Sequence, residues 1–441
     1  MITGNPIKLI LSFSIPVILG NLLQNAYNIA DTVIVGRAIG VSALAAVGAT
    51  GTIFGFFVML IAGLMSGISI VAGIKYGAGK YEELKKVYIN GLLLTLCLSA
   101  FITVTGTVFV RQLLSFMNTP DDIIDDSCKY LFIIFCGMTS TMLYNFFAEM
   151  MRALGNSKRP FIYLMVACFV NIGLDILLIS GFGMGVEGAA VATVTSQTIS
   201  AILCGLYCHR SIGYFKIRLS DIKFDFGILK QCMRIGIPNA MLNGIIMLGV
   251  LILQIVTNSI GTTYIAAYSS ASKIVSILTV PFYGFVTAMC VFISQNYGAG
   301  NISRAKNAVW QVMKLMLTAN ILVVLIAVFC SKFIIGMMVG DSSEVIALAS
   351  RYTIINAIAA FSLIPIIVYK GALQAFGKPF LPTVSGFLEV AARLLVAVYF
   401  TKKFGFLGII LTDPITWFVT CLFFVITYNI EIRKIKLSDT I

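Results

Sequence analysis

The chain has 441 residues, of which 59% are hydrophobic and only 11% are charged. Soluble globular domains carry roughly 25% charged residues, so this chain has too few charges to cover a water-facing surface. The composition therefore excludes an ordinary soluble protein and favours one that lies in a lipid bilayer. The net charge of +13 needs no nucleic-acid partner, because an excess of Lys and Arg in the inner loops of a membrane protein gives the same balance.

Apolar stretches of about 20 residues or more, the length that crosses a hydrocarbon core, recur along the whole chain. We expect an all-α membrane protein with twelve transmembrane helices in two pseudo-symmetric six-helix bundles. The expected spans are residues 7–35, 44–73, 88–114, 129–151, 161–181, 186–208, 228–258, 264–293, 307–331, 344–371, 380–401 and 405–429.

A repeated tetrapeptide indicates that the two bundles are copies of one module. Tyr76-Gly77-Ala78-Gly79 returns as Tyr297-Gly298-Ala299-Gly300, and each copy closes an apolar stretch and opens a basic segment. Duplicated halves are typical of transporters, in which two similar bundles move about a site between them. Three further landmarks return at nearly the same offset: Ile15-Pro16 with Ile237-Pro238, Ala153-Leu154-Gly155 with Ala375-Phe376-Gly377, and Phe182-Gly183 with Phe404-Gly405.

The repeat and the charges together predict the domain organisation and the orientation. We expect an N-terminal lobe at 1–208, a cytoplasmic linker at 209–227 and a C-terminal lobe at 228–441. With both termini cytoplasmic, most Lys and Arg residues fall on the inner side, as the positive-inside rule requires. The inner basic residues include Lys75, Lys80, Lys85, Lys86, Arg152, Lys158 and Arg159. The first span lacks the short apolar core and basic lead of a cleavable signal peptide, so we expect it to be retained.

Motifs of enzymes are missing from the sequence. It has no Gly-x-x-x-x-Gly-Lys-Ser/Thr phosphate loop and no His-Glu-x-x-His zinc helix, and its one histidine, His209, sits at the predicted end of a span. The ten cysteines form no Cys-x-x-Cys pair, so we expect them to be small core residues rather than metal ligands or disulfides. A membrane-embedded enzyme or sensor is an alternative without a motif to support it.

Ionisable residues inside the spans are the most informative positions, because each costs several kcal/mol in hydrocarbon unless it is paired, hydrated or neutralised. In the first span, Gln24, Tyr27, Asn28 and Asp31 recur at helical spacing and therefore share one face. In the fifth span Asn171 and Asp175 also share a face. The intramembrane charges that we single out are Asp31, Asp175, Lys273, Glu389, Arg393 and Asp413.

Two interpretations of these acids are open. Each acid is either a hydrogen-bonded core carboxylate, with Arg37 as a partner for Asp31, or part of a site that binds and releases a coupling cation. Burial disfavours the charged carboxylate and brings protonation within reach, while a sodium ion would take the same carboxylates together with amide and hydroxyl oxygens. Asn171 and Thr193 are candidates to supply such oxygens.

The first span and its neighbours resemble the multidrug and toxic compound extrusion (MATE) transporters, and the likeness covers nearly the whole chain. The matching strings are Leu23-Gln24-Asn25-Ala26-Tyr27-Asn28-Ile29-Ala30-Asp31-Thr32-Val33-Ile34-Val35-Gly36-Arg37, Leu44-Ala45-Ala46-Val47-Gly48, Arg152-Ala153-Leu154-Gly155-Asn156, Asn171-Ile172-Gly173-Leu174-Asp175 and Gly185-Val186-Glu187-Gly188-Ala189-Ala190.

This resemblance implies a two-lobed antiporter that exports cationic or amphiphilic compounds and imports protons or sodium ions, with no other cofactor. Carried over position by position from the branch with acids in the first lobe, the cation site is Asp31, Asn171, Asp175 and Thr193. Another branch uses a Glu in the seventh span, where this chain has Gln254 but no acid between Ile245 and Asn258. The resemblance therefore places coupling in the first lobe.

The second half carries different charges. Glu389 and Arg393 are spaced to form a salt bridge at i,i+4, either as a structural feature or as a conformational latch or part of the drug site. Asp413, before Pro414, is either a capping or turn carboxylate or a drug-binding group, and Lys273 has no assigned role.

Substrate recognition can be predicted only as a class. Aromatic residues make up 12% of the chain and methionines number 18, and both residue types accommodate varied lipophilic cations. The candidates for the substrate pocket are Gln24, Tyr27, Asn28, Tyr144, Asn145 and Met151.

We expect alternating access in a monomer in the cell membrane. Pro16, inside the first span, removes a backbone hydrogen bond and favours a bend there. The alternative function is a flippase for lipid-linked oligosaccharide or polysaccharide, which would require a cationic central cavity, whereas the first lobe here is acidic.

Overall fold

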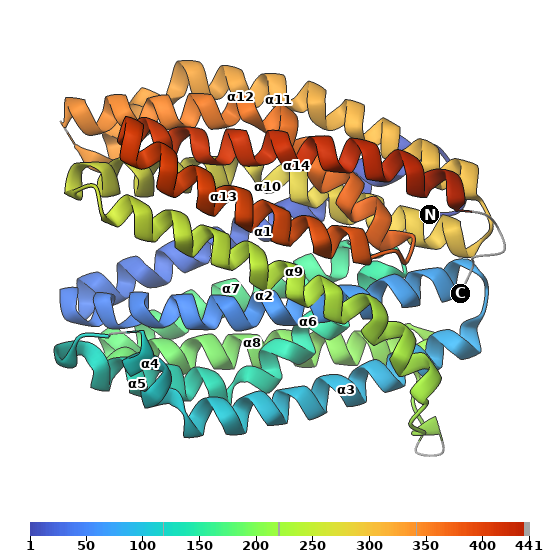
Figure 1. Ribbon diagram of the computed structural model, residues 1–441. Helices are drawn as coiled ribbons and strands as arrows, with labels where there is room; N and C mark the ends of the chain where they lie inside the picture. The colour runs from blue at the N-terminus through green and yellow to red at the C-terminus, as the bar shows by residue number, and fades with distance from the viewer. Residues whose placement is uncertain (118, 219–220, 341, 436–441) are drawn as a thin grey trace. The chain divides into compact units, whose positions relative to one another are not determined.

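The computed structural model describes residues 1–117, 119–218, 221–340 and 342–435, and these ranges form helices without any β-strand. The first half holds α1 (Pro6–Ala38), α2 (Val41–Gly77), α3 (Tyr81–Val108), α4 (Val110–Phe116), α5 (Asp121–Cys136), α6 (Met138–Ala153), α7 (Lys158–Asp175), the π-helix η1 (Ile176–Gly181) and α8 (Val186–Ser211). After η2 (Gly213–Phe215), the second half holds α9 (Phe226–Asn258), α10 (Thr262–Gly298), α11 (Ile302–Val339), α12 (Ser343–Ala375), α13 (Phe380–Phe404) and α14 (Phe406–Lys434) (Figure 1).

The all-α membrane fold predicted from composition is confirmed. Within the described residues, eleven helices are long and apolar enough to cross a membrane, or twelve if the bent pair α5 and α6 counts as one span. The expected single span at 129–151 is therefore two helices, bent by 46°. Gly137 lies at this break, where a Cβ atom would overlap the side chain of Val194 on α8. Close approach of α8 thus accounts for the glycine at the bend.

The internal repeat is visible in the helices. α1 and α9 have 33 residues each and contain Pro16 and Pro238, while α2 and α10 have 37 residues each. At the end of both α2 and α10 the repeated tetrapeptide makes the same turn: the Ala78 and Ala299 N–H groups bond back into the helix, and a glycine follows with φ of 71° or 77°. Only glycine adopts this conformation at little cost, so the repeated motif is a helix-end signal.

Contacts divide the chain into two units, each described by itself. One unit comprises Ile15–Ala240, and the other comprises Met1–Ser14 with Met241–Ile441. The divisions fall inside α1 and α9, next to Pro16 and Pro238, rather than in the segment 209–227. Each of these two proline-containing helices therefore contributes to both units.

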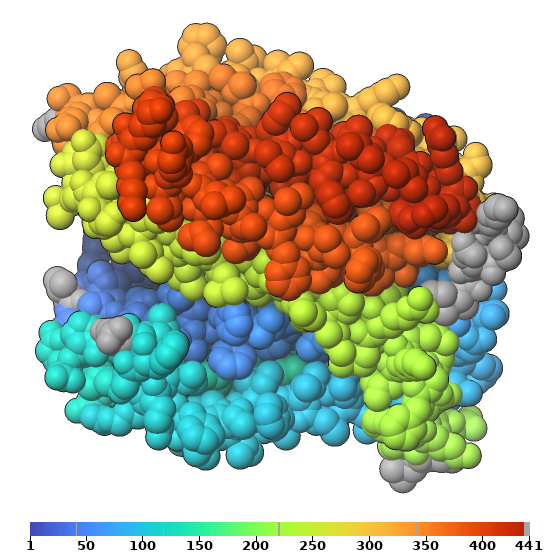
Figure 2. Space-filling view, viewed as in Figure 1, coloured from blue at the N-terminus to red at the C-terminus, as the bar shows by residue number. Residues whose placement is uncertain are grey.

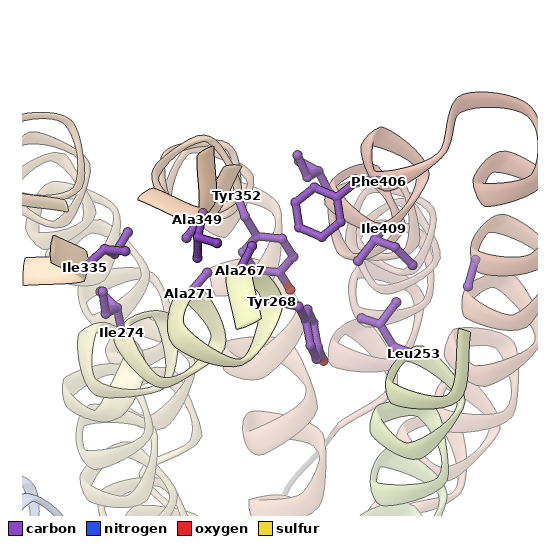
Figure 3. Close-up of a cluster of buried hydrophobic side chains, with 13 residues drawn as sticks. Leu253, Ala267, Tyr268, Ala271, Ile274, Ile335, Ala349, Tyr352, Phe406 and Ile409 are labelled. Atoms are coloured by element: carbon purple, nitrogen blue, oxygen red, sulfur yellow. The ribbon is translucent and has the colours of Figure 1, made fainter. Parts of the chain in front are cut away.

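The second unit has a packed aromatic and aliphatic core (Figure 3). In it, the rings of Tyr268 on α10 and Tyr352 on α12 meet edge to face with their centroids 5.6 Å apart. Phe406 and Ile409 on α14 pack into the same cluster. These contacts fix α10, α12 and α14 around the charged residues described below.

In the first unit, α2 packs on the beginning of α9 with the two backbones in contact. A Cβ atom on Gly67 would overlap the backbone of Gly236, and one on Gly63 would lie 2.5 Å from the Cα of Ala240. The Asn239 amide also donates a hydrogen bond of 2.9 Å to the Ser66 hydroxyl. Small residues allow this approach, as is usual at contacts between membrane helices.

Gly67→Ala should destabilise the protein by about 1–3 kcal/mol, because the added methyl group has no space and the backbones must move apart. The measurement is the thermal unfolding midpoint of the purified protein in detergent. Gly173→Ala is the matched control, since a Cβ atom at Gly173 meets nothing within 4 Å. Equal midpoints for the two variants would contradict the close packing.

The segment that leads into α9 is docked on the start of α3. Lys85 forms an ion pair of 2.6 Å with Asp221, and the side-chain Oδ1 of Asn90 accepts a 2.8 Å hydrogen bond from the Asp225 backbone N–H. Two pairs of stacked rings also join the segment to α3. The centroids of Tyr81 and Tyr214 are 4.3 Å apart, and those of Tyr88 and Phe215 are 4.1 Å apart. In the space-filling view the yellow-green surface of this segment lies near the blue beginning of α3 (Figure 2). The expected linker is thus held in place.

The segment that leads into α1 is docked at the corresponding corner of the second unit. Arg304, in the first turn of α11, donates a 2.7 Å hydrogen bond to the carbonyl oxygen of Gly4. The Asn296 amide, at the end of α10, donates to the carbonyl oxygen of Met1 at 3.3 Å. In each unit, therefore, the segment that leads into a proline-containing helix, α9 or α1, packs near the turn made by the tetrapeptide.

Asp221→Asn should loosen the docked segment, because the Lys85 partner loses its charge pair. The pKa of Asp221 is lowered by the hydrogen bond from Lys85 and by the Arg218 N–H, so the stabilisation is fully present above the ordinary carboxyl pKa and is lost only as the pH falls through the lowered value. Hydrogen exchange of residues 213–217, corrected for intrinsic rates, should be faster in the variant and should not change in the wild type between about pH 7 and pH 5. Asp126→Asn, an exposed carboxylate on α5, is the control, and wild-type protection lost in that pH range would refute the assignment.

Candidate functional site

A cavity of about 580 Å³ lies within the unit Ile15–Ala240. Its α1 wall runs from Pro16 to Asp31, which at 1.5 Å per residue is roughly 22 Å. The other walls come from α2, α5, α6, α7 and α8. The structure places most of the sequence candidates around the cavity, whose lining includes Gln24, Tyr27, Asn28, Asp31, Tyr144, Asn145 and Thr193. Met151 does not line it and is fully buried in the packed core of α6.

The polar face of α1 explains how the cavity stays polar inside an apolar bundle. Gln24, Tyr27, Asn28 and Asp31 recur every three or four residues, so a straight helix presents them together. All four reach the cavity. The stripe predicted from the spacing therefore faces the protein interior, as membrane burial requires.

Two carboxylates at one end of the cavity have polar atoms without protein partners. Asp175, the last residue of α7, is completely buried and neither of its carboxylate oxygens accepts a hydrogen bond. Asp31 Oδ1 is likewise buried without a partner, as are both amide atoms of Asn171. Within the described part of the chain, neither Asp31 nor Asp175 forms an ion pair, so the expected alternative of an Asp31–Arg37 bridge is not seen. A charged carboxylate in this setting is unstable until a proton or a cation joins it.

Tyr130 lies among these residues and was not singled out by the sequence. It is 8% exposed on α5, and its hydroxyl is close enough to interact with Asp31, Asp175 and the Thr193 hydroxyl. Its position on α5 follows no polar stripe, so only the tertiary packing reveals it. Tyr130 connects the cavity residues Asp31 and Thr193 to the deeper Asp175.

The backbone next to Asp175 is irregular. The chain continues from α7 into the π-helix η1 without a loop, and the Phe182 N–H closes it by bonding to the Leu177 carbonyl oxygen. Wide turns of this kind are rare and occur frequently at functional sites. Here the wide turn begins at the residue after the buried carboxylate.

An ion pair occupies the opposite end of the cavity. Arg152 donates a 2.6 Å bond to Glu149 one turn earlier on α6, and both side chains line the cavity with about a fifth of their surface exposed. Phe161 and Leu164, which follow in the chain, lie against Gly20, so this pair lies toward the Pro16 end and Asp31 toward the other. Glu149 lies inside the expected span 129–151 but is not among the charges singled out from the sequence.

A known protein family matches both halves of the chain. The MatE family model matches twice, at residues 16–177 and 238–399, in agreement with the internal repeat. The chain belongs to the MatE family. The two matched blocks cover most of the chain and include Asp31, Asp175 and most of the cavity lining, but not the part that α8 contributes.

Individual relatives agree with the family assignment. The chain is 27% identical to the probable multidrug resistance protein YoeA of Bacillus subtilis (strain 168), over 97% of this chain and 95% of the relative. It is 32% identical to the probable multidrug resistance protein YpnP of the same organism, over 68% and 67% of the two chains. A crystal structure of MATE in the bent conformation has the same fold, with a TM-score of 0.92 and 23% identity over 99% of this chain and 97% of that one.

The second unit of this MatE protein holds a buried cluster of paired charges. Arg393 on α13 lies 3.2 Å from Glu389 and 3.0 Å from Asp413 on α14, and the Tyr352 hydroxyl donates a 3.1 Å bond to the other Asp413 oxygen. The expected Glu389–Arg393 pair is confirmed. Asp413 belongs to the same cluster and lies within the continuous helix α14. Lys273 does not join it, because its side chain is exposed on α10, where a long Lys side chain keeps its ammonium group accessible.

The cysteines are less uniform than the sequence predicted. Cys168, Cys204, Cys208 and Cys232 are buried, but Cys97, Cys136 and Cys330 are exposed on helix surfaces. A small apolar side chain is not penalised on the lipid-facing side of a membrane helix, since lipid is as apolar as the core. No cysteine among the described residues forms a disulfide, and no group of three metal-ligating side chains occurs there.

Arg393→Met should lower the stability by about 3–5 kcal/mol, because it leaves two buried carboxylates without their cation. Thermal unfolding of the purified protein gives the comparison, with Lys273→Met as the control on an exposed Lys. The triple variant Glu389→Gln, Arg393→Met, Asp413→Asn should recover much of the loss by removing all three charges. A single variant as stable as the control would show that the pairing contributes nothing.

Proposed function

We propose that this MatE protein is a multidrug efflux antiporter that exports cationic or amphiphilic small molecules in exchange for a proton or a sodium ion. We place the exchange at Asp31, Asn171, Asp175 and Thr193, in the unit Ile15–Ala240. We further propose that it works as a monomer in the cell membrane with both termini cytoplasmic, and that it needs no cofactor other than the coupling ion.

The observation that carries the proposal is that Asp31 belongs both to the cavity and to the pair of acids with Asp175. It lines the cavity where cargo would bind, and it also interacts with the buried Asp175. A cation that joins the two carboxylates therefore removes the negative charge that would hold a cationic cargo. Competition for one carboxylate is a physical basis for exchange, because the two ligands favour different states of the same site.

The contrast between the two units supports coupling in the first. In the second unit Arg393 lies between two carboxylates, so those acids already have a cation. In the first unit the acids at Asp31 and Asp175 have none among the residues that the structure describes. An incoming cation would be stabilised most by the carboxylates that lack a partner.

The names of the relatives support drug export in general terms. YoeA and YpnP are both named probable multidrug resistance proteins. Five aromatic side chains line the cavity, in agreement with lipophilic cargo: Tyr27, Phe54, Tyr130, Tyr144 and Phe161. The flippase alternative requires a cationic cavity, and here the single base on the wall, Arg152, is neutralised by Glu149.

Alternating access would expose Asp31 and Asp175 to one side of the membrane and then to the other. Pro16 lies at the start of the cavity wall and at the point where α1 passes from one unit to the other. Its missing backbone hydrogen bond lowers the cost of bending α1 there. Bending at this point would change access to the cavity without disturbing the α1 residues that follow it.

Asp31→Asn and Asp175→Asn should each reduce ethidium efflux from cells to near the level of cells without the protein, because an amide cannot exchange a cation. Glu187→Gln, an exposed carboxylate on α8, is the control and should retain wild-type efflux. In proteoliposomes, a sodium gradient alone and a pH gradient alone identify the ion. Full efflux in both Asp variants, or no transport with either gradient, would overturn the proposal.

A further inference from the structure

A second cavity of about 500 Å³ lies where the segment that leads into α9 meets the beginning of α3. Its lining falls within residues 82–90 and 221–226, all of which belong to the unit Ile15–Ala240. The two walls are joined directly, because Lys85 pairs with Asp221 and Asn90 accepts a hydrogen bond from the Asp225 N–H. The shape of this cavity, here called the corner pocket, is therefore set by contacts within one unit.

The corner pocket lies at the depth of the lipid headgroups. α3 has no charged side chain from Gly91 to Val108, a stretch of roughly 27 Å at 1.5 Å per residue. This length matches the hydrocarbon core of a bilayer, which is about 30 Å thick. The charged first turns of α3, which line the pocket, therefore lie just outside that core.

Once its internal ion pairs are formed, the corner pocket keeps one base and one acid. Lys85 and Lys86 pair with aspartates of the segment at 2.6 and 3.4 Å. Lys223 and Glu82 also line the pocket, and within the described ranges neither forms an ion pair. One free positive and one free negative group are complementary to a zwitterion rather than to a simple anion.

The apolar part of the corner pocket comes from Phe224 and Phe226. Their rings meet edge to face with centroids 5.1 Å apart, and both line the same cavity as Lys223. Aromatic side chains next to basic ones are typical of segments that lie in the membrane interface. The pocket therefore offers charged groups and an apolar surface to one ligand.

The equivalent corner of the second unit is a comparison within the same chain. A cavity of about 430 Å³ lies there, and no acid lines it. Its one base, Arg304, donates a hydrogen bond to the Gly4 carbonyl oxygen. The duplicated corner is thus present in both units, but the free base and acid occur only in the first. When Tyr76 is aligned with Tyr297, the pocket positions Glu82, Lys86 and Asn90 correspond to Ser303, Asn307 and Gln311.

We propose that the corner pocket binds the headgroup of a phospholipid that carries both a phosphate and a primary amine, of the phosphatidylethanolamine type. The phosphate lies at Lys223, the ammonium group at Glu82, and the glycerol end of the acyl chains packs on Phe224 and Phe226. A primary ammonium group donates hydrogen bonds to a carboxylate, which a trimethylated one cannot do. The bound headgroup joins α3 to the segment and so stabilises the start of α9. This site does not depend on the cargo or on the coupling ion.

Binding of single lipids to the purified protein in detergent, titrated by native mass spectrometry, tests the proposal. The lipids are dioleoyl phosphatidylethanolamine, phosphatidylglycerol and phosphatidylcholine, which share their acyl chains. The wild type should bind the ethanolamine lipid about fivefold more tightly than the other two, which is the usual contribution of one charged contact at a membrane surface.

Two variants separate the two charged contacts. Glu82→Gln should remove the preference for the ethanolamine lipid over the glycerol lipid, whereas Lys223→Gln should weaken binding of all three lipids about fivefold. Both side chains are exposed, so both variants should unfold at the wild-type temperature without added lipid. Asn307→Ala, at the position in the second unit that corresponds to Lys86, is the matched control and should bind the lipids as the wild type does.

Equal binding of the three lipids by the wild type, or binding unchanged in Lys223→Gln, would overturn the proposal. A preference lost in Asn307→Ala would place the site in the second unit and would overturn it as well. Soluble glycerophosphoethanolamine distinguishes a lipid from a free metabolite. At a concentration equal to that of the lipid it should not displace the lipid, and displacement would refute the assignment to a lipid. None of these measurements involves efflux, so they are separate from the test of the proposed function.

Discussion

The structure depends on one constraint, that a polar group in hydrocarbon must find its partner inside the protein. Helices satisfy the backbone N–H and C=O groups, and turns that contain a glycine with positive φ end the helices. In the second unit, Arg393 lies between Glu389 and Asp413, so these three charges are paired inside the protein. Asp175 differs from them, because both of its carboxylate oxygens are buried without a partner among the described residues. At such a position an outside partner has most to contribute.

The cavity of the first unit is organised by two charged ends. A paired set, Glu149 with Arg152, lies toward Pro16, and an unpaired carboxylate, Asp31, lies at the other end. Between them, α1 contributes a polar wall and α2 contributes a wall of apolar side chains and glycines. The charged groups and the apolar surface of the cavity therefore come from different helices.

The sequence predicted the features that follow from helical periodicity and from the free-energy cost of a charged side chain in hydrocarbon. Helix-spaced polar residues placed Gln24 to Asp31 on one face, and the i,i+4 spacing of Glu389 and Arg393 predicted their pair. Features that depend on contacts between distant residues were not predictable. Tyr130 follows no polar pattern, and the bend at Gly137 depends on its contact with Val194. Whether Lys273 is buried or exposed depends on the packing of α10, which spacing does not reveal.

The repeated corners have a consequence for the history of the chain. Glycines with positive φ recur at matching points of both halves, at 40 and 261, 79 and 300, 155 and 377, and 183 and 405, so the duplicated frame has been kept at its turns. The buried charges Asp31, Asp175, Glu389, Arg393 and Asp413 belong to helices and lie several residues from those turns. After a gene duplication, single substitutions at such positions could give the copies separate duties without rebuilding either frame. One half would then be free to become a rigid, charge-balanced body while the other kept the ion chemistry.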